Sequence, residues 1–211
     1  MKRGHWQILL AAALFLLALG LTLYPVVSNW YIGRHQSRIQ TEYREVLEQT
    51  DSAEIESIRE SAVAYNKTIT PGAAEEAYSQ ESIRAAFEDY VNQLSVSGIG
   101  IMGYVEIPKI GADLPIYHGT GADSLDRGTG HLLGSSLPVG GESTHTIITG
   151  HSGMASQKMF TDLEQLREGD IFYLHVLDET LAYEVREIHT VLPHDTTYLG
   201  IEPGEDLCTL V

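Results

Sequence analysis

The residue types that could carry chemistry in this chain are few. It has one cysteine, Cys208, and nine histidines. A thiolate can attack a carbonyl carbon, and a histidine can move protons near neutral pH. Cys208 lies in "DLCTLV", residues 206–211, and as the sole cysteine it cannot form an internal disulfide. It is therefore either a nucleophile or a small side chain of the core.

The segment "THTIITGHSG", residues 144–153, is the strongest candidate for a site. An apolar strand over Ile147 and Ile148 runs into Gly150, so His151 is expected at the mouth of the strand. Loops held by a rigid scaffold are where catalytic groups tend to lie. By the same reasoning His131 and His145 are equally good catalytic candidates, so the residue types and their spacing do not distinguish the three histidines.

Other kinds of chemistry find little support. Neither "GHSGM" (150–154) nor "GSSLP" (134–138) fits the G-x-S-x-G pattern of a serine nucleophile. The chain has no H-E-x-x-H motif and no Cys/His cluster, and His189 and His194 are expected at a strand end, so we expect no metal centre. The chain has 29 acidic and 13 basic residues, and this acidic balance argues against nucleic-acid binding.

The elements that must position these residues begin with a membrane anchor. Residues Ile8 to Val27 carry no charge, and twenty helical residues span the roughly 30 Å of hydrocarbon. Lys2 and Arg3 precede the run, which predicts a cytoplasmic N-terminus and an exported remainder. The run is longer than a signal-peptide core and has no small-x-small cleavage site, which favours an uncleaved anchor. Residues 1–33 are thus predicted to be the tail and the transmembrane helix.

Residues 34–98 are predicted to form a helical region. Apolar residues at three-to-four spacing predict an amphipathic helix over 36–65, which Asp51-Ser52 could divide in two. "TPG" (70–72) ends that pattern, and a second helix is predicted from about Ser79. The glycine-rich "SVSGIG" (95–100) is predicted to be a hinge.

Residues 99–211 change to short β-rich runs separated by turn residues. One short helix is predicted among them, over residues 158–166. Several short strands with turn signals between them predict a closed barrel or a sandwich. The seven runs are residues 101–107, 112–117, 128–134, 143–149, 170–176, 180–192 and 206–211.

Four stretches of this region resemble the sortases, most closely the class C, pilin-polymerising branch. They are "GYVEIPKIGADLPIYHGT" (103–120), "GTGHLLGSSLPVGGESTHTIITGHSG" (128–153), "FTDLEQLREGDIFYLHVLDETLAYEV" (160–185) and "DLCTLV" (206–211). The resemblance implies an eight-stranded sortase β-barrel and a membrane-bound cysteine transpeptidase. Such enzymes cut an LPxTG-like sorting signal between Thr and Gly and pass the acyl group to an amine.

The resemblance also implies partners and a location. The substrates would be pilins or other surface proteins that carry a sorting signal. The acceptor would be a lysine amine or a cell-wall precursor, and the chemistry would need no cofactor. The enzyme would sit in a Gram-positive-type cell membrane on a single N-terminal anchor, with its catalytic domain outside and room for a further C-terminal transmembrane helix.

The family's catalytic histidine belongs to a TGH motif, which is residues 149–151 here, so the resemblance selects His151. Its cysteine ends the motif T-L-x-T-C, of which Thr209, Leu210 and Val211 match the first three positions. The nucleophile is then expected two residues beyond Val211, and the family's arginine further on, so residues 1–211 alone are expected to be inactive. Cys208 would lie about 16–17 Å from that nucleophile and on the opposite face of the strand, where a buried packing role is expected.

One departure from the family's pattern and two other functions stay open. Many class C sortases carry a lid with an Asp-Pro-aromatic triplet, and none occurs between Tyr65 and Tyr104. "TPGAAEEAY" (70–78) occupies the approximate place, with Tyr78 either a plug or a surface aromatic. The alternatives to a pilin polymerase are a housekeeping sortase that anchors proteins to the cell wall and a non-catalytic, membrane-anchored β-barrel binding module.

Overall fold

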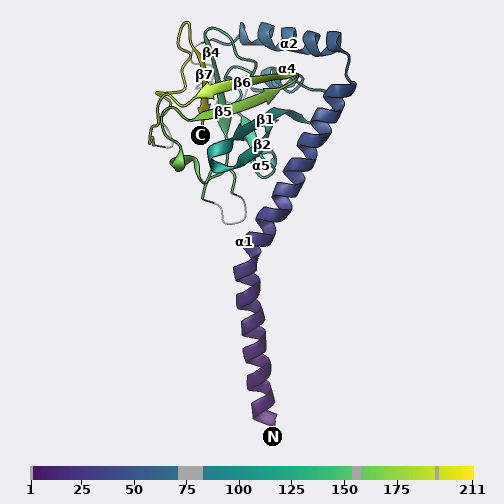
Figure 1. The fold of residues 1–211 in the computed structure, drawn as a ribbon, viewed down its shortest axis with the longest axis vertical. Helices are drawn as coiled ribbons and strands as arrows, with labels where there is room; N and C mark the ends of the chain where they lie inside the picture. Colours follow the sequence, from purple (N-terminus) through teal and green to yellow (C-terminus); the bar gives the residue numbers. More distant parts are fainter. Residues whose placement is uncertain (1, 71–82, 154–157, 193–194) are drawn as a thin grey trace.

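The computed structural model describes residues 2–70, 83–153, 158–192 and 195–211. One long helix, α1 (Lys2–Gln49), contains both the apolar run and the first half of the predicted amphipathic helix (Figure 1). The predicted break lies where expected. Asp51 is the N-cap of α2 (Ser52–Asn66), and its Oδ1 accepts a hydrogen bond of 2.8 Å from the Ala53 amide.

The strands form one sheet in the order β6-β5-β1-β2-β3-β4-β7. Most neighbours are antiparallel, but β2 with β3 and β4 with β7 run parallel. The strands are β1 (Ile101–Ile107), β2 (Ala112–His118), β3 (Thr129–His131), β4 (Thr144–Thr149), β5 (Ile171–Val176), β6 (Glu179–Glu184) and β7 (Asp206–Leu210). Short helical turns connect some of them: η1 (Pro108–Ile110), α5 (Ala122–Leu125) and η2 (Leu163–Gln165).

The two outer strands of this sheet approach each other. The Tyr183 hydroxyl on β6 donates a hydrogen bond of 2.8 Å to Asp206 Oδ1 on β7. Beyond the ends of these strands, Arg186 pairs with Glu202 at 3.2 Å. The seven strands therefore curl into a nearly closed barrel, which confirms the predicted mainly β, sortase-like fold class.

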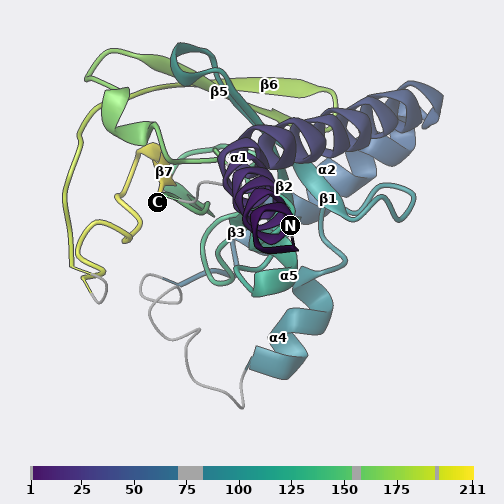
Figure 2. The same cartoon turned by 90° about the horizontal axis from the view of Figure 1, so that it is seen from below.

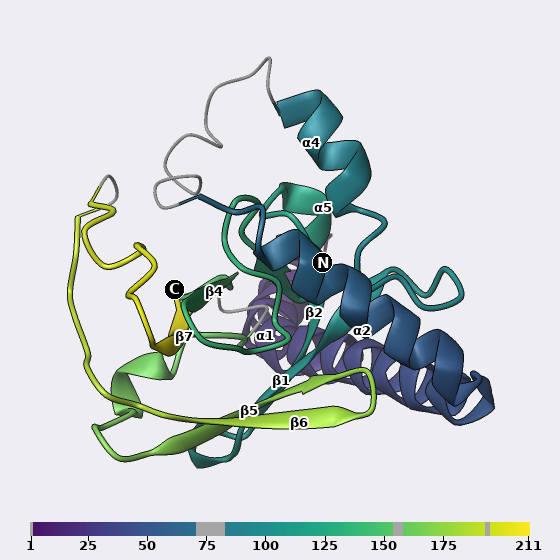
Figure 3. The ribbon, with the colours of Figure 1, turned by 90° about the horizontal axis from the view of Figure 1, so that it is seen from above.

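Both long helices pack against one flank of the barrel, and β7 with the C-terminus lies on the other (Figures 2 and 3). Tyr43 of α1 is 1% exposed. Its hydroxyl donates to the Met102 carbonyl at 3.0 Å and accepts from the Leu177 amide at 2.8 Å. Burial raises the pKa of Tyr43 to about 12. One helix side chain thus holds β1 and the β5–β6 turn together.

Three predicted elements are clearly shorter than expected. Of the run 128–134, only β3 (Thr129–His131) is a strand. Of the helix predicted over 158–166, only the single turn η2 is present among the described residues. The amides of Thr161, Leu163 and Leu166 bond to carbonyls three residues back rather than four, so this segment forms a run of tight turns instead of an α-helix. The strand predicted over 180–192 ends at Glu184, because its partner β5 starts at Ile171, the residue paired with Glu184.

The helix predicted from about Ser79 is described from Ile83 to Tyr90, as α4. Residues 71–82, which include Pro71, Gly72, Tyr78 and Ser79, lie outside the described part of the chain. The predicted hinge at 95–100 contains turns, yet Val96 within it is 1% exposed and packs into the core. The division at residue 33 falls inside α1.

Candidate active site

The backbone around His151 is fixed from two sides. Strand β4 ends at Thr149, and the next amide, of Gly150, donates to the Val211 carbonyl at 2.8 Å. The His151 carbonyl accepts from the Phe160 amide at 3.0 Å. A Cβ on Gly150 would lie 2.7 Å from the Phe160 ring, so the glycine allows the loop to lie directly on that ring. His151 therefore leaves the strand in one defined direction.

The His151 side chain is 34% exposed, and its Nε2 lies 3.7 Å from Asp126 Oδ1. Asp126 is the C-cap of α5, the short helix between β2 and β3. No motif pointed to Asp126, because 25 positions separate it from His151 and only the β2–α5–β3 connection brings the two together. The carboxylate can pair with the imidazolium whenever His151 carries a proton.

His131, the second candidate, has a structural position. It is fully buried on β3. Its Nδ1 is 2.9 Å from the Tyr90 hydroxyl, and its Nε2 is 2.8 Å from the Ser136 carbonyl oxygen. Burial lowers the pKa of His131 to about 4. Both ring nitrogens are used inside the fold, so the ring cannot reach a substrate.

His145, the third candidate, is also held on both sides. Its Nδ1 is 2.7 Å from the Gly200 carbonyl oxygen, and its Nε2 is 2.7 Å from Thr209 Oγ1. Burial is the main reason that its pKa is lowered. Of the three candidate histidines, only His151 presents its ring to solvent beside a carboxylate.

Strand β7 runs parallel to β4 in a constant register. Thr144 pairs with Asp206, Thr146 with Cys208 and Ile148 with Leu210, each pair differing by 62 positions. The ladder continues past the last pair, since the Val211 amide donates to the Ile148 carbonyl at 2.9 Å. The end of β7 therefore runs along β4 toward His151.

Cys208 lies on the face of β7 opposite Thr209. Thr209 reaches His145, whereas Asp206, which shares a face with Cys208, reaches Tyr183. The Cys208 residue as a whole is partly exposed, but its side chain packs against the core. Burial, helped by the nearby Asp206 carboxylate, raises the pKa of the Cys208 thiol far above its ordinary value. Paired with Thr146, Cys208 is also displaced along the strand from His151.

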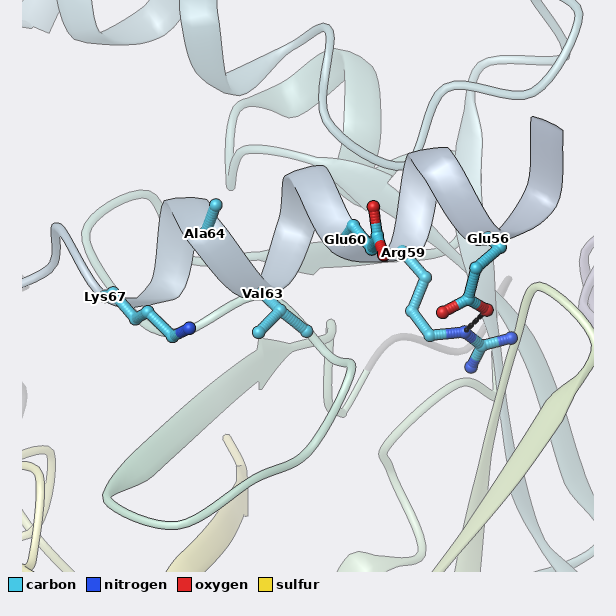
Figure 4. A pocket seen from close by; sticks show the side chains of 6 residues that line it. All are labelled: Glu56, Arg59, Glu60, Val63, Ala64 and Lys67. Atoms are coloured by element: carbon cyan, nitrogen blue, oxygen red, sulfur yellow. Dashed lines mark hydrogen bonds and ion pairs between the residues drawn. The ribbon is translucent and has the colours of Figure 1, made fainter. Parts of the chain in front are cut away.

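A hollow of about 340 Å³ on α2 lies apart from these residues (Figure 4). Its most prominent side chain, Arg59, bonds to Glu56 and pairs with Asp178 and Glu179 at the β5–β6 turn. These bonds make Arg59 a clamp between α2 and the barrel. The hollow is lined by Glu56, Arg59, Glu60, Val63, Ala64 and Lys67.

No group of three or more His, Cys, Asp and Glu side chains that could hold a metal ion gathers in the described ranges. His189, one of the two histidines around Pro193, stacks on Tyr198 with ring centroids 3.8 Å apart and bonds to Glu187 at 2.8 Å. His194, the other, lies outside the described residues.

Comparison with known proteins adds the family. The family model for the sortase domain matches residues 105–211. Sortase D of Bacillus subtilis (strain 168) is 28% identical over 153 residues, covering 72% of this chain and 71% of that protein. The crystal structure of sortase C from Streptococcus pneumoniae matches with a TM-score of 0.71 at 44% identity, covering 82% of this chain and 86% of that one.

Sortase C1 from Streptococcus agalactiae matches with a TM-score of 0.74 at 39% identity, covering 82% of this chain and 88% of that one. These two structural neighbours are class C enzymes, the branch that the sequence motifs indicated. Three findings indicate the same family. The barrel is nearly closed, the TGH motif lies at the mouth of β4, and the family model matches residues 105–211. This chain belongs to the sortase family.

Proposed function

We propose that this protein is a class C-type sortase that cleaves an LPxTG-like sorting signal between Thr and Gly and joins the new acyl end to an amine, with His151 as general acid and base. The parallel register of β4 and β7 carries this proposal. Paired residues differ by 62 positions. The same register, continued past Val211, would bring position 213 level with His151. That is the position at which the T-L-x-T-C motif, begun by Thr209, would have its cysteine.

Neighbouring strands lie about 4.8 Å apart, which suits a thiolate and an imidazole that must act on the same peptide bond. Cys208 does not suit this role, because it is level with Thr146, five residues before His151. Five residues span about 16–17 Å along a strand. We therefore propose that the nucleophile is a cysteine two positions past Val211.

The reaction proceeds in two steps. The thiolate attacks the Thr carbonyl carbon, the C–N bond to Gly breaks, and His151 gives its proton to the departing amine. A thioester remains on the enzyme. The acceptor amine then attacks that thioester, His151 takes a proton from the amine, and the thiolate leaves as the new amide forms. An arginine later in the chain would stabilise the oxyanion of both steps.

Asp126 has a supporting part in this scheme. Its carboxylate, 3.7 Å from Nε2, pairs with the imidazolium that exists before the first proton transfer and after the second. Because the Asp126 side chain is 66% exposed, water screens this pair, and its contribution to the reaction is modest.

The substrates we propose are pilins with a sorting signal, and the acceptor is a lysine amine of the next subunit. A cell-wall precursor as acceptor would instead make the enzyme a housekeeping sortase. The apolar stretch of α1 would hold the enzyme in the membrane with residues 34 onward outside. This stretch has a mean hydropathy of 2.3, and none of it is buried in the protein.

The test is cleavage of an LPxTG peptide, followed by release of the glycine-containing product. Residues 1–211 alone should show no turnover. A form extended through the next cysteine and arginine should be active, and His151→Ala should abolish that activity. Cleavage by residues 1–211 above the level of their own His151→Ala variant would disprove the proposed nucleophile.

The acceptor is tested in the extended form by offering two amines together, a pilin fragment with its lysine and a cell-wall precursor peptide. Transfer to the pilin lysine supports the polymerase. Transfer to the precursor alone would reassign the enzyme to the housekeeping group. A Lys→Arg variant of the pilin fragment controls for the attacking amine.

A further inference from the structure

The membrane anchor and the His151 site are joined by a direct contact. Helix α1 continues without interruption from the apolar run to Gln49. Its first buried residue is Gln36, which is 6% exposed. The Gln36 amide nitrogen Nε2 donates a hydrogen bond of 3.2 Å to the Arg127 carbonyl. Arg127 directly follows Asp126, the residue 3.7 Å from His151.

The contact continues along one face of the helix. Gln40 and Tyr43, one and two turns after Gln36, are 3% and 1% exposed. Arg127 is itself held, because its guanidinium lies 4.4 Å from the centre of the Tyr117 ring and its Nε donates to the Asp123 carbonyl at 2.7 Å. The end of α5 is therefore fixed to the part of α1 that first meets the barrel.

The other end of this segment lies at the expected membrane surface. Trp30 and Tyr31 are 60% and 69% exposed, as aromatic residues at a lipid interface would be before insertion. The Arg34 guanidinium lies 5.0 Å from the centre of the Trp30 ring. Gln36 comes six positions after Trp30, which is about 9 Å of helix at 1.5 Å per residue. A helical segment of less than two turns, held by the barrel at one end and by the expected lipid interface at the other, has little freedom to bend.

The domain has two ends along this axis. Figure 1 shows α1 leaving the barrel on the side where α5 lies, while α2 crosses the far end. Figure 2, seen from the N-terminal end of α1, shows α5 beside the helix. In a membrane crossed by the apolar run of α1, the α5 side of the barrel would face the lipid, and α2 would face away.

We propose that α1 is a rigid spacer of fixed length, which holds the His151 side of the barrel facing the membrane at a height of about 9 Å, less than two helical turns. The surface formed by α5 and the His151 loop then meets peptide and amine groups that are presented just above the lipid headgroups. This inference rests on the membrane anchoring in the proposed function, but not on the identity of the nucleophile.

Electrostatics does not produce this orientation. The chain has a formal net charge of −16, and α5 presents Asp123 and Asp126 to the anionic membrane surface. Arg127 beside them and Arg34 on α1 carry the opposite charge, so this end of the domain has no single-sign field that would draw it to an anionic lipid layer. The helix must therefore hold the domain in place. The height of the domain above the membrane should not change between low and high salt.

The experiment uses the full chain in lipid vesicles that contain an acceptor dye on the headgroups. A donor dye is attached at Asp123→Cys on α5 or, as the matched variant, at Ser57→Cys on α2. Co-flotation with the vesicles is measured first. We expect energy transfer to be strong from residue 123, weak from residue 57 and unchanged by salt.

The spacer length is then changed directly. Seven helix-forming residues inserted after Arg34 add about 10 Å and nearly two full turns, so the buried face of α1 keeps its direction. Transfer from residue 123 should fall toward the level seen at residue 57. The same seven residues inserted after Arg3, on the other side of the apolar run, are the control and should change nothing.

Equal transfer from residues 123 and 57 would show that the domain tumbles on a flexible tether, which would overturn the spacer. An insertion after Arg34 without effect on transfer would overturn it as well. Failure of the unmodified chain to float with vesicles would instead remove the membrane anchoring and the spacer together. Failure of peptide cleavage in the earlier assay would leave this result standing.

Discussion

At the scale of single residues, the chain separates its histidines by what each ring nitrogen contacts. His131 and His145 bond to Tyr90, Ser136, Gly200 and Thr209 within the fold, whereas His151 stands at the solvent boundary. A ring whose two nitrogens are bonded inside the protein cannot exchange protons with a substrate without breaking the fold. Function at this scale therefore follows from exposure as much as from residue type.

Cys208 allows a prediction at the same scale. Thiol reagents react with the thiolate, and burial raises the pKa of the Cys208 thiol, so the folded protein should be modified slowly. Labelling with a maleimide should be substoichiometric in buffer and reach one label per chain in denaturant. Mass spectrometry gives the stoichiometry.

The matched control for this labelling is Ser57→Cys, on the exposed side of α2. This variant should take up one label rapidly while Cys208 remains unmodified. Rapid stoichiometric labelling of the unaltered protein would contradict the buried, non-catalytic role of Cys208.

At the scale of elements, α2 is attached to the barrel by side chains that bond to backbone. The Asn66 side chain donates to the Leu137 carbonyl at 3.1 Å and accepts from the Leu137 amide at 2.7 Å. In the middle of α2, Arg59 pairs with Asp178 and Glu179. The loop before β4, which leads to His151, is thus held to a helix far away in sequence.

Replacing Asn66 with alanine should remove both bonds to Leu137. The Leu137 amide and carbonyl would then lack partners, which costs about 1–3 kcal/mol when such groups are buried. The free energy of unfolding from urea titration should fall by that amount.

Lys67→Ala, at the exposed position next to Asn66, is the matched control for this loss and should change the free energy of unfolding only slightly. Equal stabilities of the Asn66→Ala and Lys67→Ala variants would show that the two bonds between Asn66 and Leu137 contribute nothing to stability.

At the scale of the whole molecule, a buried polar network joins α4 to the barrel. The Tyr90 hydroxyl accepts from the Gly119 amide at 2.9 Å and contacts His131 on β3. His118 on β2 bonds to the Gln93 carbonyl oxygen at 2.8 Å and packs edge-on against Tyr90. The contacts that join α4, β2 and β3 therefore depend on His131, which must stay neutral.

The stability of the fold should therefore fall in mild acid. The folded-state pKa of His131, about 4, lies below the ordinary value, so the unfolded chain takes up a proton first as pH falls. Stability is lost from about pH 6.5 downward, and the loss ends near pH 4. The part due to His131 is roughly 2 kcal/mol between pH 7 and pH 5. His118 and His145, whose pKa values burial also lowers, add to the loss in the same direction.

Urea titrations at pH 7 and pH 5 measure this effect. His131→Asn should show a smaller difference in unfolding free energy between the two pH values, whatever its absolute stability. His189→Gln, a change at a surface histidine, should keep the full difference. An unchanged difference in His131→Asn would contradict the buried, neutral state of His131.

The local pattern of the chain determined much of this protein. The apolar run, the helix break at Asp51-Ser52 and the seven strand cores follow from hydrophobicity, spacing and turn residues, which act between near neighbours. The motif around residues 149–151 selected His151 by resemblance, and the alternation of side chains along β7 placed Cys208 on the opposite face. These features are local, so they can be predicted without the fold.

Only the tertiary structure decided which long-range partners meet. Three features depend on elements that are far apart in sequence. They are the closeness of Asp126 to His151, the bond from Gln36 to Arg127 and the end of β6 at Glu184. The helix predicted over residues 158–166 is instead a run of turns, whose amides bond three residues back, as Thr161 does to Lys158 and Leu166 does to Leu163. Backbone groups bond to the partner that packing brings within reach, and the local sequence does not encode which groups packing brings together.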